Sequence, residues 1–293
     1  MWWLACLQGA AALGSPPPAD ARAASPASSR FWRGKRVFLA GASSGLGEAV
    51  AEELSARGAS LVIGARRTEA LARVAAACAA RSGGDPPRVL GLDVCAPRAE
   101  LEAKACEAAA LLGGGVDVLC YCAGRGQRTR AAETSAEAHA LLMATNFEGA
   151  VTLSRAVLPA MLERGEGHLC VVSSVQGFFG QPGRTSYAAS KAAMIGYFDG
   201  LRAEVASSGV RVTVVSPGYI ATDHAASAVG SDGTADENSK KGMLPGVLAE
   251  RIADAVERGE PELIASQLDG RVAIWLRVLW PSVLFKLMEK KSS

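Results

Sequence analysis

The chain alternates short apolar runs with longer stretches in which apolar residues recur at helical spacing. Each apolar run is short enough to form one strand. The runs cover residues 36–40, 60–64, 88–92, 116–120, 167–173, 211–216 and 262–266. Residues 48–57 and 68–81, between the early runs, are rich in Ala, Leu and Glu and end near glycine, as helices do. Apolar strands that alternate with helices predict a parallel sheet covered on both faces.

We therefore expect one α/β domain over residues 34–267. Its fold class is a single Rossmann-like, doubly wound parallel sheet of about seven strands, with helices on both faces. The 293 residues are 49% hydrophobic and 20% charged, which suffices for a full core. In such sheets, ligands bind beyond the carboxyl ends of the strands.

Residues 1–33 lie outside this pattern. They begin with an apolar stretch that is short for a bilayer span and lacks the basic start of a standard signal peptide. A segment rich in Pro, Ala, Ser and Arg follows. The interpretations left open are an anchor, an organellar transit-like segment and a disordered tail.

Residues 268–293 form a second unusual segment, which is apolar and helical in pattern. Trp275 and Trp280 lie between flanking Arg and Lys residues, which suits a membrane interface. Arg277, Pro281 and Lys286 interrupt the apolar run and argue against a clean transmembrane helix. The alternative is a helix packed on the domain or on a second copy in a homo-oligomer.

Charge and composition exclude several function classes. Lys and Arg number 31 and Asp and Glu 29, and no basic block with interleaved aromatics is present, so no nucleic-acid partner is expected. The seven cysteines form no CxxC pair, and the three histidines show no zinc-ligand spacing. We expect neither a disulfide framework nor a metal site.

A glycine-rich turn follows the first predicted strand and precedes a predicted helix. Its glycines permit a tight turn and close approach of a pyrophosphate to the backbone, and the helix N-terminus offers free N–H groups. Serine hydroxyls in the turn add donors. The candidate cofactor residues here are Gly41, Ser43, Ser44, Gly45, Leu46 and Gly47.

The end of the second predicted strand carries Arg66 and Arg67 where an acid would bind the ribose of NAD. Arginine pairs instead with the 2′-phosphate of NADP, so NADP(H) is the expected cofactor. The alternative is that both are solvated surface charges. Asp93 and Val94, after the third strand, are expected beside the adenine, although Asp93 is also suited to cap a turn.

Tyr187 and Lys191 are four residues apart, on one helix face. A neighbouring ammonium and a cationic nicotinamide would lower the pKa of the phenol, which then exchanges a proton with an alcohol or alkoxide. Ser174, at the end of the fifth strand, is placed to hydrogen-bond the substrate oxygen. Asn146 is expected to anchor a water that relays protons to Lys191.

In order and spacing, these motifs resemble the short-chain dehydrogenase/reductase superfamily over roughly residues 35–266. The resemblance implies that Asn146, Ser174, Tyr187 and Lys191 form the catalytic set. It also implies that the turn after the sixth strand holds the nicotinamide carboxamide. That turn supplies Pro217, Gly218, Ile220 and Thr222.

One segment departs from the family pattern. After the fourth strand the family usually has Asn-Asn-Ala-Gly, but this chain has Tyr121, Cys122, Ala123 and Gly124. The last three remain in the expected cofactor set. Loss of the amide predicts weaker local order or cofactor affinity, without removing a proton-transfer group.

A closer resemblance is to the member 7 (7B-like) branch of that family, through residues 173–177, 184–191, 201–204, 216–220 and the tail at 275–281. It implies a membrane-associated NADPH reductase, chiefly of the endoplasmic reticulum, acting on lipid-like ketones. The implied substrates are acyl- or alkyl-dihydroxyacetone phosphate, steroids or retinoids. The alternative is a catalytically silent NADP-binding protein that acts through partners. Residues 224–244, polar and Gly-rich, are expected to form a mobile substrate lid or an ordinary surface insertion.

Overall fold

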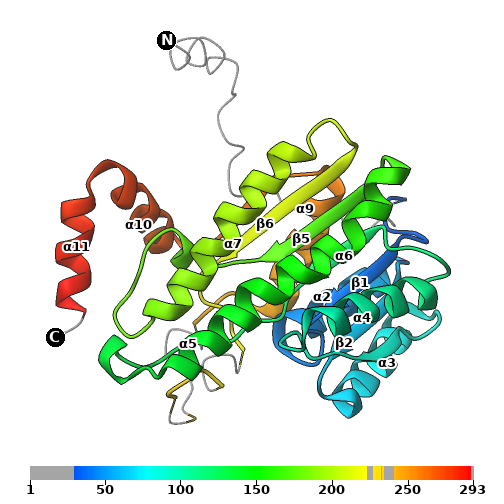
Figure 1. Ribbon diagram of the computed structural model, residues 1–293, viewed down its shortest axis with the longest axis horizontal. Helices are drawn as coiled ribbons and strands as arrows, with labels where there is room; N and C mark the ends of the chain where they lie inside the picture. The colour runs from blue at the N-terminus through cyan, green and yellow to red at the C-terminus, as the bar shows by residue number, and fades with distance from the viewer. Residues whose placement is uncertain (1–29, 223–226, 232, 234–240, 292–293) are drawn as a thin grey trace.

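The computed structural model describes residues 30–222, 227–231, 233 and 241–291, which form three layers with a central sheet (Figure 1). All strand pairs are parallel, in the order β3-β2-β1-β4-β5-β6-β7. The strands are β1 (Arg36–Ala40), β2 (Ser60–Ala65), β3 (Arg88–Gly91), β4 (Val118–Tyr121), β5 (Gly167–Val172), β6 (Val210–Pro217) and β7 (Glu262–Ala265). The predicted seven-stranded, doubly wound sheet is confirmed.

Helices cover both faces of this sheet. One face is covered by α2 (Gly45–Ala56), α3 (Thr68–Ser82) and α9 (Pro245–Arg258). The other is covered by α4 (Arg98–Leu111), α6 (Gly149–Arg164) and α7 (Thr185–Glu204), while α5 (Ala136–Met143) precedes α6. The strands are therefore apolar on both sides because both sides are buried.

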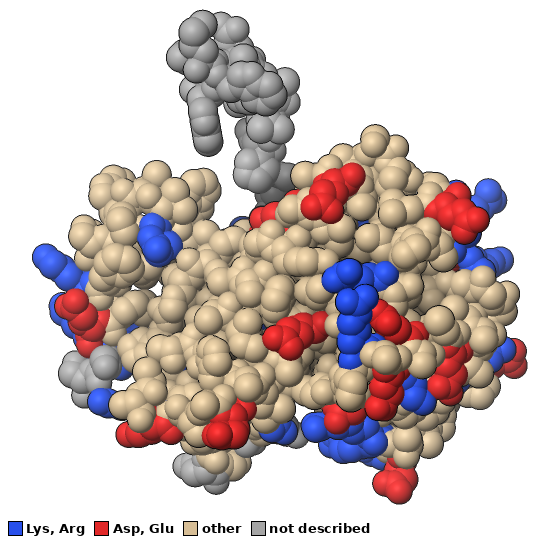
Figure 2. Space-filling view, in the orientation of Figure 1, with Lys and Arg blue, Asp and Glu red and all other residues tan. Residues whose placement is uncertain are grey.

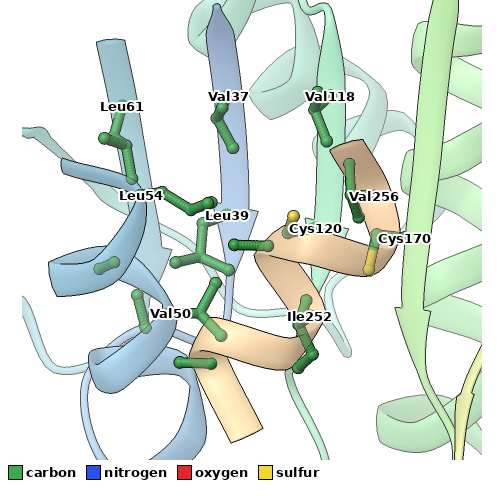
Figure 3. Close-up of a cluster of buried hydrophobic side chains, with 14 of the residues drawn as sticks. Val37, Leu39, Val50, Leu54, Leu61, Val118, Cys120, Cys170, Ile252 and Val256 are labelled. Atoms are coloured by element: carbon green, nitrogen blue, oxygen red, sulfur yellow. The ribbon is translucent and has the colours of Figure 1, made fainter. Parts of the chain in front are cut away.

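The first face shows how the packing fixes the glycine turn. Figure 3 shows Val50 and Leu54 of α2 meeting Ile252 of α9 over Leu39 of β1. These four side chains are almost wholly buried. Because α2 is clamped between β1 and α9, its N-terminus is held at the carboxyl end of β1.

Two expected boundaries differ from the structure. The fold extends before residue 34, because Trp32 is completely buried in the hydrophobic core. The fourth strand is displaced toward the C-terminus, from 116–120 to Val118–Tyr121. Asp117 instead accepts hydrogen bonds from the backbone and side chain of Arg36, which fixes the entry to the strand.

The C-terminal segment forms a helix pair, α10 (Leu268–Leu279) and α11 (Pro281–Lys290), which projects beside the sheet (Figure 1). It packs on the short 3-10 turn η4 (Val175–Gly177) through a cluster centred on Val175, Phe179 and Leu284. One side of this tail is therefore packed on its own domain. Within the described ranges, every helix is too short or too polar to cross a bilayer.

Candidate active site

A cavity of about 1250 Å³ lies at the carboxyl ends of the strands, where the strand order reverses between β1 and β4. This is the position at which doubly wound sheets bind ligands. The whole expected cofactor set lines it: Gly41, Ser43, Ser44, Gly45, Leu46, Gly47, Arg66, Arg67, Asp93, Val94, Cys122, Ala123, Gly124, Tyr187, Lys191, Pro217, Gly218, Ile220 and Thr222. Ser174 lines it as well.

The glycine turn packs closely on neighbouring backbone, which is possible only because side chains are absent. Gly41 has φ +90°, and a Cβ there would overlap the backbone nitrogen of Ala123. A Cβ on Gly47 would overlap the carbonyl oxygen of Gly41. The turn therefore lies flat against the strand ends and aims the N-terminus of α2 at the cavity. This arrangement fits the pyrophosphate of a nicotinamide dinucleotide.

The polar groups around the expected adenosine site are already organised. Arg67 Nη2 donates to Ser43 Oγ at 3.0 Å and to Ser44 Oγ at 2.8 Å. Arg66 is exposed beside it at the cavity edge. Asp93 accepts a hydrogen bond from Cys95 N at 3.0 Å, so it caps a turn and also lines the cavity.

Three of the four expected catalytic residues converge on the cavity. Ser174 follows β5, and its hydroxyl is hydrogen-bonded to Tyr187, in the first turn of α7. Lys191 lies one turn further along α7, where its carbonyl accepts from Ser173 Oγ at 3.0 Å. Gly177 permits this close packing, because a Cβ there would lie 2.9 Å from the Lys191 oxygen.

The electrostatics of the pair differ from the expectation. Burial raises the pKa of Tyr187, and the hydrogen bond with Ser174 opposes that rise. Lys191 Nζ donates to the Val172 carbonyl at 2.8 Å and lies 5.9 Å from the phenol ring centroid. Burial therefore outweighs any lowering of the Tyr187 pKa by this charge, and a bound cationic nicotinamide would add to that lowering. Burial lowers the pKa of Lys191 to about 8.

The amide of Asn146 is held by protein groups, and its expected role in anchoring a water stays a prediction. It lies in a π-helical turn, η3 (Ala144–Glu148), is wholly buried, and is not among the cavity-lining residues. Both donors of its amide are used, by Arg125 O at 3.0 Å and by Ser190 Oγ at 2.9 Å, and its oxygen accepts from Arg125 N at 2.7 Å. The side chain therefore ties the loop after β4 to α7.

Gln127 is a site residue that the sequence analysis missed. Its amide is completely buried, and Oε1 accepts from Tyr187 N at 3.0 Å, one of the first-turn N–H groups that a helix cannot satisfy itself. Its Nε2 donates to Thr134 Oγ1 at 2.9 Å. Gln127 therefore fixes the start of α7 from the loop after β4. A single glutamine in a loop carries no sequence signal for this role.

Tyr121 was also missed. Its side chain is completely buried, and its hydroxyl donates to the Thr145 carbonyl at 2.6 Å. The residue in place of the first usual asparagine thus supports the π-helical turn that holds Asn146. Cys122 keeps the backbone path, since its N–H donates to Ala40 O at 2.8 Å. Burial raises the pKa of the Cys122 thiol, which remains neutral.

The C-terminal segment gives the cavity a largely apolar lining, to which Asp269 and Lys291 add two charged side chains. We call it the apolar wall; its members come from the C-terminal helix pair and are Val272, Ala273, Leu276, Leu284, Leu287 and Met288. The opposite side, formed by the Gly41–Gly47 turn and the loops after β2, β3 and β4, is here called the glycine wall. Ser174 and Tyr187 line the same cavity as both walls.

The expected lid at 224–244 falls largely outside the described residues. Of its described part, Val229 pairs with Gln127 and Met243 with Ile220 through isolated backbone bridges. These bridges connect it to the loop after β4 and to the turn after β6.

Comparison with known proteins places this geometry in a family. The short chain dehydrogenase model matches residues 35–232. A dehydrogenase/reductase SDR family protein 7-like of Drosophila melanogaster is 40% identical over 267 residues, covering 88% of this chain and 81% of that protein. A dehydrogenase/reductase SDR family member 7B of Danio rerio is 37% identical, covering 88% and 85%.

A solved structure agrees with this placement. The crystal structure of a short-chain dehydrogenase from Streptomyces avermitilis has a TM-score of 0.71 and 31% identity, covering 88% of this chain and 97% of that one. The chain belongs to the short-chain dehydrogenase/reductase family and is, with that family, an oxidoreductase that uses a nicotinamide cofactor.

Proposed function

We propose that the protein uses NADPH to reduce a bulky, lipid-like ketone to a secondary alcohol. The observation that carries the proposal is the hydrogen bond between the Ser174 and Tyr187 side chains in a cavity with one polar and one apolar wall. Two hydroxyls that reach each other are able to share one carbonyl oxygen.

The chain's own groups supply the proton and hold the oxygen. A bound nicotinamide would supply the hydride to the carbonyl carbon. Because burial raises the pKa of Tyr187, the phenol is protonated at neutral pH, which is the form that donates to a developing alkoxide. Ser174 is placed to donate a second hydrogen bond to that oxygen. The ammonium of Lys191 lies beside the phenol ring and favours the phenolate left behind.

The preference for NADP(H) over NAD(H) is supported by the two arginines at the end of β2. Arg66 and Arg67 line the cavity where a dinucleotide ribose would lie, and Arg67 is already oriented by two serine hydroxyls. Arg66→Ala and Arg67→Ala should each weaken the binding of NADPH about tenfold or more, while the affinity for NADH changes by less than about twofold. Equal losses for both cofactors, measured by fluorescence titration, would remove this part of the proposal.

The substrate class is supported by the apolar wall. Leu276, Leu284 and Met288 present only hydrocarbon and thioether surface to the cavity. Such a surface favours an alkyl or fused-ring body over a small polar ketone, by about 25 cal/mol for each Å² of apolar area removed from water. Long-chain glycerone derivatives, steroids and retinoids all fit this description.

The direct experiment is NADPH oxidation by the full-length protein against a panel of ketones that differ in apolar size. We expect kcat/KM to rise with apolar size, and Ser174→Ala to lower kcat by about 10²- to 10³-fold on every active ketone. NADPH binding without turnover of any ketone would instead favour the silent nucleotide-binding protein.

A further inference from the structure

The C-terminal helix pair has two apolar faces, and only one is used by the fold. The inner face packs on Val175 and Phe179 and forms the apolar wall. The outer face exposes Trp275, Val278, Trp280 and Phe285. Among the described residues, most of the large apolar side chains that are exposed belong to this pair. Figure 2 shows its surface as largely tan, with Lys and Arg at the outer edge.

The two faces meet at the cavity rim. Val272 and Leu287 line the cavity, yet both remain 45% exposed. Both residues therefore belong to the exposed apolar surface and to the cavity lining.

The charges on the pair indicate what covers the outer face. Residues 268–291 contain five Lys or Arg and two Asp or Glu, a net charge of +3 (5 − 2). Arg277 lies over the Phe285 ring at 5.4 Å, so its guanidinium accompanies an exposed aromatic. Protein interface cores are depleted in lysine, whereas Trp interleaved with Lys and Arg suits the headgroup level of a bilayer.

The lengths of the helices define the binding mode. α10 has 12 residues and α11 has 10, with Pro281 at the junction. At 1.5 Å per residue each is roughly 15 to 18 Å long, about half of a hydrocarbon core. Such helices lie in the interface plane and do not span.

We propose that the outer face of the C-terminal helix pair docks on an anionic phospholipid surface, and that the rim at Val272 and Leu287 admits substrate directly from the bilayer. The docking rests on the exposed face and its charge. The substrate path rests, in addition, on the proposed reduction of a lipid-like ketone.

The test compares vesicle binding by full-length proteins that share the same N-terminal segment. The variant Trp275→Ser/Trp280→Ser removes two exposed aromatics that do not line the cavity. The matched control, Val89→Ser/Leu162→Ser, removes two exposed apolar residues on β3 and α6. Co-sedimentation uses phosphatidylcholine vesicles with and without phosphatidylserine.

We expect the wild type and the control to bind the phosphatidylserine vesicles equally, and the tryptophan variant about tenfold more weakly. Lys286→Glu should weaken binding to the anionic vesicles about tenfold and leave phosphatidylcholine binding unchanged. The tryptophan variant should reduce a water-soluble ketone normally, but reduce a vesicle-borne long-chain ketone more slowly.

Two results would overturn the docking. Equal vesicle binding by the wild type and the tryptophan variant would place the membrane contact elsewhere or remove it. A wild-type dimer that the tryptophan variant converts to monomer in sedimentation velocity would show that a second copy covers the face. Absence of ketone turnover with tryptophan-dependent vesicle binding would refute only the proposed reduction and its substrate path.

Discussion

The two walls of the cavity are built in different ways. The glycine wall is made largely of backbone, and the helix and strands that present it are anchored in a large core that includes Leu39, Leu54 and Ile252. The apolar wall is made of side chains on a helix pair whose attachment centres on three buried residues, Val175, Phe179 and Leu284. One wall is therefore fixed for a constant cofactor, and the other is able to adjust to a variable substrate.

The largest expected effect comes from filling the glycine wall. Gly41→Ala would place a Cβ against the backbone nitrogen of Ala123, and the φ of residue 41 is positive. We expect the turn to move or the free energy of unfolding to fall by about 3 kcal/mol or more. We expect cofactor affinity to fall at least about 100-fold, measured by fluorescence titration. Gly246→Ala, on α9 with open space around it, is the control and should bind normally. Normal binding by Gly41→Ala would contradict the close fit.

A matched pair of core truncations sharpens the comparison. Leu54 and Leu284 are both 1% exposed; Leu54 lies in the core that anchors the glycine wall, and Leu284 is a member of the apolar wall. Leu54→Ala should lower the free energy of global unfolding by about 3 kcal/mol. Leu284→Ala should leave global stability within about 1 kcal/mol, because the helix pair opens separately, but should raise KM for bulky ketones. Equal shifts in denaturant midpoint would show that both walls belong to one cooperative unit.

Gln127 tests whether the start of α7 must be held from the loop after β4. Gln127→Leu leaves the Tyr187 N–H without its acceptor, and we expect kcat to fall about 10- to 100-fold with KM for NADPH nearly unchanged. Gln127→Glu keeps an acceptor and should recover part of kcat. Thr134→Val removes the hydroxyl that accepts from Gln127 Nε2, and it should lower kcat less than Gln127→Leu does. A loss confined to stability would argue against a positioning role.

The smallest expected effect is the pH dependence set by Lys191. Its pKa is lowered to about 8, so its ammonium is present below that pH and lost as the pH rises. The rate of single-turnover ketone reduction should fall about twofold by pH 8 and about tenfold for each further pH unit. Lys191→Arg should flatten this limb, because arginine stays charged. A constant wild-type rate up to pH 10 would contradict the role of the ammonium.

The sequence predicted the glycine wall well because that wall depends on local signals. Gly41, Gly45 and Gly47 stand between an apolar strand and a helix, and this context specifies both the turn and its ligand class. The seven strands were recognisable because each is an apolar run bounded by polar residues. The entry to β4 was misplaced because the Arg36–Asp117 pairing cannot be read from periodicity.

The remaining site residues depend on contacts between distant segments. The Gln127 amide acts on a helix 60 residues later, and the Asn146 amide is used by Arg125 and Ser190, so neither geometry has a local signature. The C-terminal helix pair has an apolar pattern that fits a membrane, a partner or its own domain equally. The structure shows that the inner face packs on its own domain, and the proposed lipid contact concerns the outer face.

The central claim is that Tyr187 delivers a proton to a carbonyl oxygen beside the cofactor. The most direct measurement is turnover of NADPH and a long-chain ketone by Tyr187→Phe, with NADPH affinity measured in parallel. Loss of only the hydroxyl should lower kcat by about 10²- to 10⁴-fold while NADPH affinity stays within about twofold. Equal turnover by the variant and the wild type would contradict the account.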